Sequence, residues 1–153
     1  MSSILFDLSG KIDQPTVNAL SLLKRVADDL GIPFEERYPE RAKDAEDLSL
    51  IMNSYEDAGN FERLYDQVQN LLQAEGFDTR LAGIRLLGRD MAKMADHETA
   101  EVVRRILCNE TERVSQYRLV VDMIRGKPRF DKTFDQTRLQ VEKLKEGFLE
   151  IIS

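Results

Sequence analysis

The chain has 153 residues, of which 42% are hydrophobic and 33% are charged, and its formal net charge is -6. This composition suits one globular domain with a sizeable core. The negative charge argues against a broad surface for nucleic acid or anionic lipid, although it leaves room for a local basic patch.

The cysteine content and the N-terminus indicate a compartment. Cys108 is the single cysteine, so no intrachain disulfide can form and a reducing environment is expected. No apolar run approaches the roughly 18 residues that a membrane helix needs. The first residues, MSSILFDLSGK, do not follow the pattern of a signal peptide. We therefore expect a cytoplasmic protein that makes no membrane contact.

The N-terminal part of the chain reads as an irregular arm followed by a helix. Residues 1–12 are expected to be extended or irregular, and the apolar residues 4–8 could form a short strand or a hydrophobic arm. A helix is predicted over residues 14–30. Pro15 lies in its first turn, where the N–H that proline lacks would have no partner, and Gly31 ends it.

The next segment is predicted to hold two helices. Residues 34–40 are expected to be a connector, because Pro39 disfavours a helical conformation of the residue before it. The second helix is predicted over 39–54, and a turn follows at 57–60. Asn60 then caps a third helix, 60–74. The residues expected to face inward from this third helix are Phe61, Leu64, Tyr65, Val68, Leu71 and Leu72.

The longest amphipathic run is FDTRLAGIRLLGRDMAKMA, residues 77–95, and we expect the other helices to pack around it. Asp78 can cap its first turn. Gly83 and Gly88 lie inside the run, where each glycine costs about 1 kcal/mol relative to alanine. A close crossing by another helix is the interpretation that we favour. The apolar residues with spacings of three and four are Leu81, Ile84, Leu87, Met91 and Met94.

Three further helices are predicted after this run. They cover residues 97–108, which Asp96 caps, then 110–125 and 131–151. No later segment has the pattern of a strand, and no linker divides the chain. The sequence therefore predicts an all-α, single-domain bundle over residues 1–153, with about six to seven helices, short connections and a short irregular N-terminal arm.

A charged cluster lies on the predicted second helix at Arg41, Lys43, Asp44 and Asp47. Asp44 and Asp47 are three residues apart, so they share one face of the helix. Two carboxylates in this arrangement could hold a magnesium ion or orient Lys43, and Arg41 is a candidate phosphate contact. The competing interpretation is an exposed acidic patch, which is usual on a surface helix.

A second cluster is basic. Arg85, Arg89 and Lys93 follow one another at intervals of four along one helix face, and Arg104 and Arg105 follow on the next helix. Together they could form a local patch for a phosphate or a nucleotide, with Arg85 and Arg89 as the main candidates. Pairing with neighbouring acidic residues is the alternative.

Other chemistry is weakly represented. The chain has one histidine and no CxxC, HExxH, GxxxxGK[ST] or GxGxxG motif. No metal site and no cofactor is therefore expected. His97 lies in the first turn of a predicted helix, where the helix dipole disfavours a charged imidazole, so we expect it to be exposed or capping. Cys108 is read as a small apolar side chain on a helix.

Two long segments, 5–34 and 36–150, contain the phrases RAKDAEDL (41–48) and LAGIRLLGRD (81–90). They resemble parts of the nucleotidyltransferase family related to AbiEii/AbiGii toxins, within the polymerase-beta-like nucleotidyltransferases. The first segment resembles the N-terminal helix that leads to the first core strand. The second resembles the helical C-terminal half, and the two phrases are the most specific parts of the match.

The resemblance also implies that a part is missing. In the family, a Gly-Ser or Gly-Ala turn and a strand with an Asp-x-Asp or Asp-x-Glu pair hold the catalytic metal ions. Here Phe34 is followed directly by Glu35, and neither feature is present. The chain then divides into 1–34 and 35–153, without the catalytic strands between them. Asp44 and Asp47 match the position of a supporting Asp in the family, but they would have no ion to serve.

Three functions stay open from the sequence. The first is a truncated, catalytically inactive relative that binds a protein partner. The second is an active nucleotidyltransferase-type enzyme or toxin–antitoxin component that binds NTP and magnesium. The third is a homo-oligomerisation module, because loss of a sheet would uncover apolar surface on helix 14–30 and around Met52. Symmetric pairing would then cover the same patch on both copies.

Overall fold

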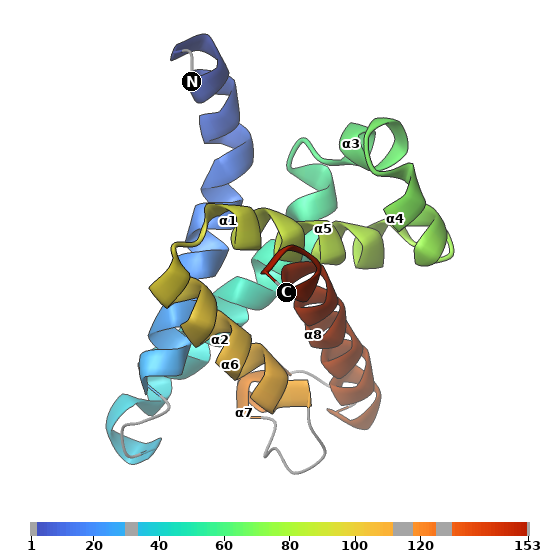
Figure 1. The fold of residues 1–153 in the computed structure, drawn as a ribbon. Coiled ribbons are helices and arrows are strands. Elements are labelled where there is room, and N and C mark those ends of the chain that lie inside the picture. Colours follow the sequence, from blue (N-terminus) through green and yellow to red (C-terminus); the bar gives the residue numbers. More distant parts are fainter. Residues whose placement is uncertain (1–2, 30–33, 112–117, 125–129, 153) are drawn as a thin grey trace.

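The structure, a computed structural model, describes residues 3–29, 34–111, 118–124 and 130–152. All of the regular secondary structure in these ranges is helical, so the all-α prediction is confirmed (Figure 1). Side chains are described for 14–27, 42–108, 119–124 and 133–152. The elements are α1 (Ser3–Asp29), α2 (Phe34–Ser54), the 3-10 helix η1 (Tyr55–Asp57), α3 (Phe61–Asp66), α4 (Gln69–Ala74), α5 (Thr79–Met94), α6 (His97–Thr111), α7 (Arg118–Ile124) and α8 (Phe130–Ile152).

Helix α5 lies at the centre of the bundle, as expected from its sequence (Figure 1). It contacts α1, α2, η1, α3, α4 and α8. The Asp78 side chain caps it by accepting a hydrogen bond from the N–H of Leu81, with an N–O distance of 3.0 Å. Most of the helix is enclosed, and its buried residues are Ala82, Gly83, Ile84, Leu86, Leu87, Gly88, Met91 and Ala92.

Helix α8 crosses α5 with the two backbones in contact. A Cβ placed on Gly88 would lie 2.3 Å from the carbonyl oxygen of Leu144, and one placed on Gly147 would lie 1.9 Å from the carbonyl oxygen of Arg85. At Gly83 the nearest neighbour would be the Cβ of Glu56 in η1, at 3.3 Å. The prediction that both glycines of α5 mark close crossings is confirmed, and Gly147 is the matching small residue on α8.

The N-terminal segment differs from its predicted conformation. Helix α1 is continuous from Ser3, so residues 3–12 are helical, and Pro15 lies inside the helix instead of at its start. The segment does project from the bundle as an arm (Figure 1). Ile4, Leu8 and Ile12 are spaced four residues apart, as on one face of a helix. The prediction overlooked this repeat because it placed the start of the helix at Pro15.

The predicted connector over residues 34–40 is wrong, because α2 begins at Phe34 and includes Pro39. A proline removes one backbone donor and restricts the residue before it. These local costs are outweighed where a long helix packs along a neighbour, as α2 does along α1. The end that was predicted for α1, at Gly31, lies outside the described residues.

The predicted helix 60–74 is broken into α3 and α4. The backbone leaves helical geometry at Val68, where φ is -129° and ψ is 43°. The break lets Leu64 and Leu72 both point inward, but it leaves Phe61 and Tyr65 exposed, contrary to the prediction. Their rings instead pack against each other, with centroids 5.1 Å apart.

The C-terminal helices follow the predicted order. Asp96 caps α6 by accepting a hydrogen bond from the N–H of Thr99 at 2.7 Å, as expected, although α6 runs on to Thr111. Helix α7 occupies the end of the predicted 110–125 helix, and residues 112–117 lie outside the described part. Helix α8 agrees with the predicted 131–151.

No helix in the part of the chain that the structure describes combines the length and apolar character required to cross a bilayer.

Candidate functional site

The two aspartates of the acidic cluster are bound by different cations. Asp44 accepts two hydrogen bonds from Arg25 on α1, Nη2–Oδ1 at 3.0 Å and Nε–Oδ2 at 3.2 Å. Asp47 pairs with Lys43, one turn away on α2, at 3.3 Å. The side chain of Arg41 lies outside the described residues. Asp44 and Asp47 therefore share a helix face without converging on one point.

Metal ligands do not gather elsewhere in the described part of the chain. Among those residues, no group of three or more His, Cys, Asp and Glu side chains is placed to hold a metal ion. The magnesium site suggested for Asp44 and Asp47 therefore gains no support from the geometry.

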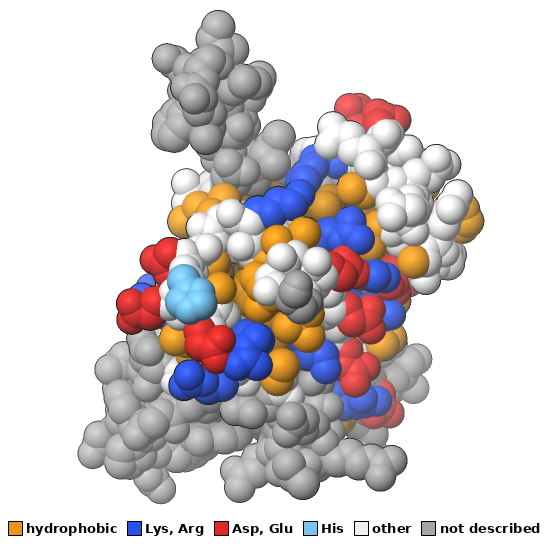
Figure 2. Space-filling view, in the orientation of Figure 1, with side chains coloured by type: hydrophobic (Ala, Val, Ile, Leu, Met, Phe, Trp, Pro, Cys, Tyr) orange, Lys and Arg blue, Asp and Glu red, His pale blue; other side chains and the backbone are white. Residues whose placement is uncertain are grey.

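The basic row on α5 faces acidic side chains. Arg85 contacts Glu75 (Nη1–Oε2, 2.9 Å) and Glu150 (Nε–Oε1, 2.7 Å), and Arg89 also pairs with Glu150. Lys143 on α8 pairs with the other oxygen of Glu75 at 3.1 Å. On the face shown in Figure 2, acidic and basic side chains alternate over α8. Arg85 and Arg89 therefore belong to a network that joins the C-terminal end of α4 with α5 and α8, whereas Lys93 is exposed.

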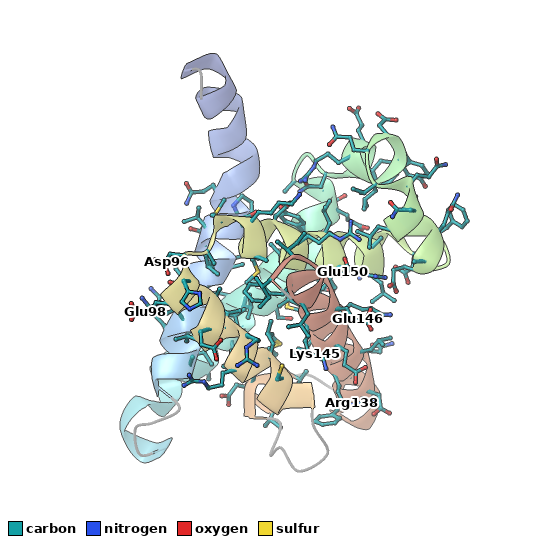
Figure 3. All side chains as sticks on the ribbon, viewed as in Figure 1. Asp96, Glu98, Arg138, Lys145, Glu146 and Glu150 are labelled. Atoms are coloured by element: carbon teal, nitrogen blue, oxygen red, sulfur yellow. The ribbon has the colours of Figure 1, made fainter. Side chains whose placement is uncertain are left out.

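The ion pairs of this network stabilise the charged form of Arg85. Burial by itself would lower the pKa of Arg85, but its hydrogen bonds to Glu150 and Glu75 outweigh burial and raise that pKa. The Glu75 side chain is only 4% exposed, so its carboxylate is stabilised by the ion pairs with Arg85 and Lys143 and little by water. Glu146 and Glu150 lie on successive turns of α8 (Figure 3). A phosphate that approached Arg85 would have to displace partly buried partners.

Arg104 and Arg105 have a separate partner. Arg104 donates to Glu101 on α6 (Nε–Oε2, 3.1 Å), and Arg105 lies 3.8 Å from the same carboxylate. The five basic residues are therefore not one continuous row facing a common anion. His97 is exposed, as expected (Figure 2), and Cys108 is partly buried on α6.

A largely buried polar cluster around Asp90 was not found from the sequence. The Tyr55 hydroxyl on η1 hydrogen-bonds to Thr16 of α1 at 2.8 Å and donates to Asp90 of α5. Asp90 also accepts both arms of Arg63 from α3, at 2.9 and 3.1 Å. Arg63 in turn donates to Asn60 at 2.7 Å. The cluster therefore connects four elements, and Thr16, Tyr55 and Asn60 are buried.

The protonation states of this cluster suit structure better than catalysis. Burial, followed by the charge and hydrogen bond of Asp90, raises the pKa of Tyr55 far above its ordinary value. The hydrogen bond to Asp90 also raises the pKa of Arg63. A tyrosine held protonated in this way is a poor acid or base near neutral pH. No sequence signal linked these residues, because 35 positions separate Tyr55 from Asp90.

An open groove lies between α1 and α2. Its volume is about 410 Å³, and its lining residues are Asn18, Ser21, Leu22, Arg25, Asp47, Leu50 and Ile51. Leu50 is 69% exposed. Met52, around which uncovered apolar surface was expected, is instead buried in the core, because α2 turns that side toward the rest of the bundle. Among the described side chains of α2, residues 42–54, the uncovered apolar surface is therefore centred on Leu50.

Comparison of the chain with protein-family models, with curated proteins and with solved structures gave no match. The nucleotidyltransferase-like relationship therefore stays a prediction that rests on the sequence phrases alone. The candidate site is therefore described from the structure alone. It comprises two charge clusters that form ion pairs within the protein, a buried polar cluster and an apolar groove.

Proposed function

We propose that this chain is a non-catalytic, nucleotidyltransferase-like helical module of the cytoplasm that acts by self-association. In this account it carries no cofactor and binds no nucleic acid. Self-association takes place through the surface of the bundle, and the buried core keeps that surface in a fixed shape.

The supporting observation is that the described candidate catalytic and phosphate-binding side chains already form ion pairs with other side chains of the protein. Asp44 is held by Arg25, while Arg85 and Arg89 are held by Glu150. A nucleotide or a metal ion would have to replace these ion pairs and recover the free energy of the broken hydrogen bonds. By contrast, another chain can cover the exposed apolar side chain of Leu50 without breaking an ion pair within the protein.

The enzyme alternative is tested with labelled ATP, GTP, CTP and UTP in the presence of magnesium. The proposal predicts no transfer of label to protein, RNA or a small acceptor above a boiled control. Transfer that disappears in Asp44→Asn but persists in Glu98→Gln, a change on the exposed surface of α6, would contradict it, because it would assign Asp44 a role in chemistry.

Self-association is tested by sedimentation velocity of the wild-type chain over a range of micromolar concentrations. The proposal predicts a reversible shift from monomer to dimer as concentration rises. A species that sediments as a monomer throughout that range would refute the self-association part of the proposal.

A further inference from the structure

Helix α3 lies at the edge of the bundle and exposes two aromatic side chains (Figure 1). Its main contacts are with α4 and α5. Leu64 is buried on the inner side, and the two arms of Arg63 hold the helix to Asp90 on α5. Phe61 is 49% exposed and Tyr65 is 44% exposed, and their ring centroids lie 5.1 Å apart. The fold therefore presents two neighbouring rings to solvent on a helix whose position is fixed from the inner side.

A row of carboxylates lies beside these rings. Glu62 and Asp66 are four residues apart, so they are neighbours on the helix surface, and Glu62 is three residues from Tyr65. Both acidic residues are exposed, and neither forms an ion pair with a residue that the structure describes. Like charges at this spacing destabilise a helix, and no described cation offsets them here. We call the four residues Phe61, Glu62, Tyr65 and Asp66 the α3 face.

The surroundings of the α3 face are also acidic. Residues 55–78 contain six acidic residues and one basic residue, Arg63, which is paired with Asp90. The whole chain carries a net charge of -6. A surface of this kind attracts cationic groups and repels phosphate groups, nucleic acid and the same face of a second copy. Charge complementarity therefore favours a basic partner.

We propose that the α3 face binds an arginine-rich segment of a partner protein. A planar guanidinium can stack on the exposed ring of Tyr65 or Phe61 and donate hydrogen bonds to the neighbouring carboxylate of Glu62. A lysine ammonium carries the same charge without a flat surface, so arginine is favoured. The bound segment offsets the repulsion between Glu62 and Asp66 and covers both rings. This binding goes beyond the proposed self-association, and the α3 face shares no residue with the groove around Leu50.

The test titrates the full ¹⁵N-labelled chain with an acetylated and amidated hexa-arginine peptide at physiological salt, and follows the amide signals by NMR. We expect the shifts to concentrate in residues 57–67. The dissociation constant should be about threefold or more below that of hexa-lysine, because only arginine stacks on the rings. Shifts spread over the whole acidic surface, equal affinities for the two peptides, or no binding at all would each overturn the proposal.

Variants separate the contribution of the rings from that of the charge. Phe61→Ala combined with Tyr65→Ala should weaken hexa-arginine binding about fivefold, whereas Tyr65→Phe keeps the ring and should bind like wild type. Glu62→Gln should weaken binding about threefold. The matched control Glu98→Gln removes the same charge from the exposed surface of α6 and should leave binding nearly unchanged.

The variants also keep the proposal testable if one of them misfolds. All the substituted side chains are exposed, so the helical circular dichroism should match that of wild type. Glu62→Gln removes the repulsion with Asp66, so it provides a folded variant even if the double alanine change disturbs α3. Wild-type affinity in Glu62→Gln, or an equal loss in Glu98→Gln, would overturn the proposal. Sedimentation is measured without peptide, so these outcomes leave self-association standing.

Discussion

Arg63 and Asp90 form a two-armed ion pair in which the guanidinium of α3 reaches the carboxylate of α5 at 2.9 and 3.1 Å. The two side chains are 22% and 14% exposed, so water screens them only in part. Tyr55 donates to the same carboxylate. This pair attaches the short α3 helix to the central helix of the bundle.

Removing the charge of Asp90 should therefore destabilise the fold. Asp90→Asn leaves Arg63 partly buried without its anion, and we expect the free energy of unfolding to fall by about 2–3 kcal/mol. Urea denaturation measures this change. Lys43→Met removes one member of an exposed pair and should change the free energy by less than about 0.5 kcal/mol. Equal effects of the two variants would show that the pair on Asp90 contributes no more than a surface salt bridge.

The close crossing of α5 and α8 gives a second prediction. In Gly147→Ala the new Cβ would lie 1.9 Å from the carbonyl oxygen of Arg85, so the helices must separate. We expect a loss of about 3 kcal/mol or more, because the obstacle is backbone and cannot rotate away. Thermal unfolding followed by circular dichroism provides the measurement.

Gly83 supplies the matched control for the crossing. A Cβ there would approach the Cβ of Glu56 to 3.3 Å, which a small shift can relieve. Alanine also gains about 1 kcal/mol of helix propensity over glycine. Gly83→Ala should therefore lie within about 1 kcal/mol of wild type. If Gly147→Ala were equally mild, the backbone contact between α5 and α8 would be disproved.

The buried tyrosine predicts a dependence of stability on alkaline pH. Burial and Asp90 raise the pKa of Tyr55 in the folded chain above its ordinary value of about 10. The folded state therefore binds the proton more tightly than the unfolded state. The raised pKa of Tyr55 therefore contributes fully to the free energy of unfolding below about pH 10. This contribution declines as the pH rises from that value toward the pKa of Tyr55 in the folded state.

Tyr55→Phe isolates this contribution from other alkaline titrations. The variant should lose about 1 kcal/mol at neutral pH, from the broken hydrogen bonds. It should also show a flatter decline in the free energy of unfolding above pH 10 or so than wild type. Parallel curves for the two proteins in urea titrations would mean that Tyr55 ionises equally easily in both states.

Phe77 gives a prediction about backbone strain. Its φ is 65°, in the left-handed region, and its side chain is exposed. A non-glycine residue pays roughly 1–2 kcal/mol there. Phe77→Gly should therefore raise the free energy of unfolding by up to about 1 kcal/mol, after the extra chain entropy of glycine is subtracted. Phe77→Ala keeps the strain and should gain nothing, so a rise in both variants would point to the exposed ring instead.

Local signals in the sequence were enough to predict much of this fold. Asp78 and Asp96 cap their helices as expected, because a cap depends on residues within one turn. Gly83 and Gly88 marked close crossings, because glycine inside a helix has a cost that packing must justify. The central place of α5 followed from its unbroken amphipathic pattern.

The errors arise where distant contacts override local preference. Pro39 was predicted to start a helix, but α2 begins at Phe34 and packs along α1. Phe61 fits the apolar repeat of a continuous helix 60–74, but the helix breaks at Val68 and Phe61 is exposed. The Tyr55–Asp90 contact joins residues that are far apart in the sequence, so no spacing rule could find it. The charged candidates were found as residues, but their pairing with Arg25 and Glu150 depends on how the helices pack.

The most direct measurement of the central claim is the molar mass of the wild-type chain by sedimentation equilibrium, from low to high micromolar concentration. The monomer is 17.6 kDa. Self-association through the apolar surface around Leu50 predicts a mass that rises reversibly toward twice this value. A mass that stays at that of the monomer at every concentration would contradict the account.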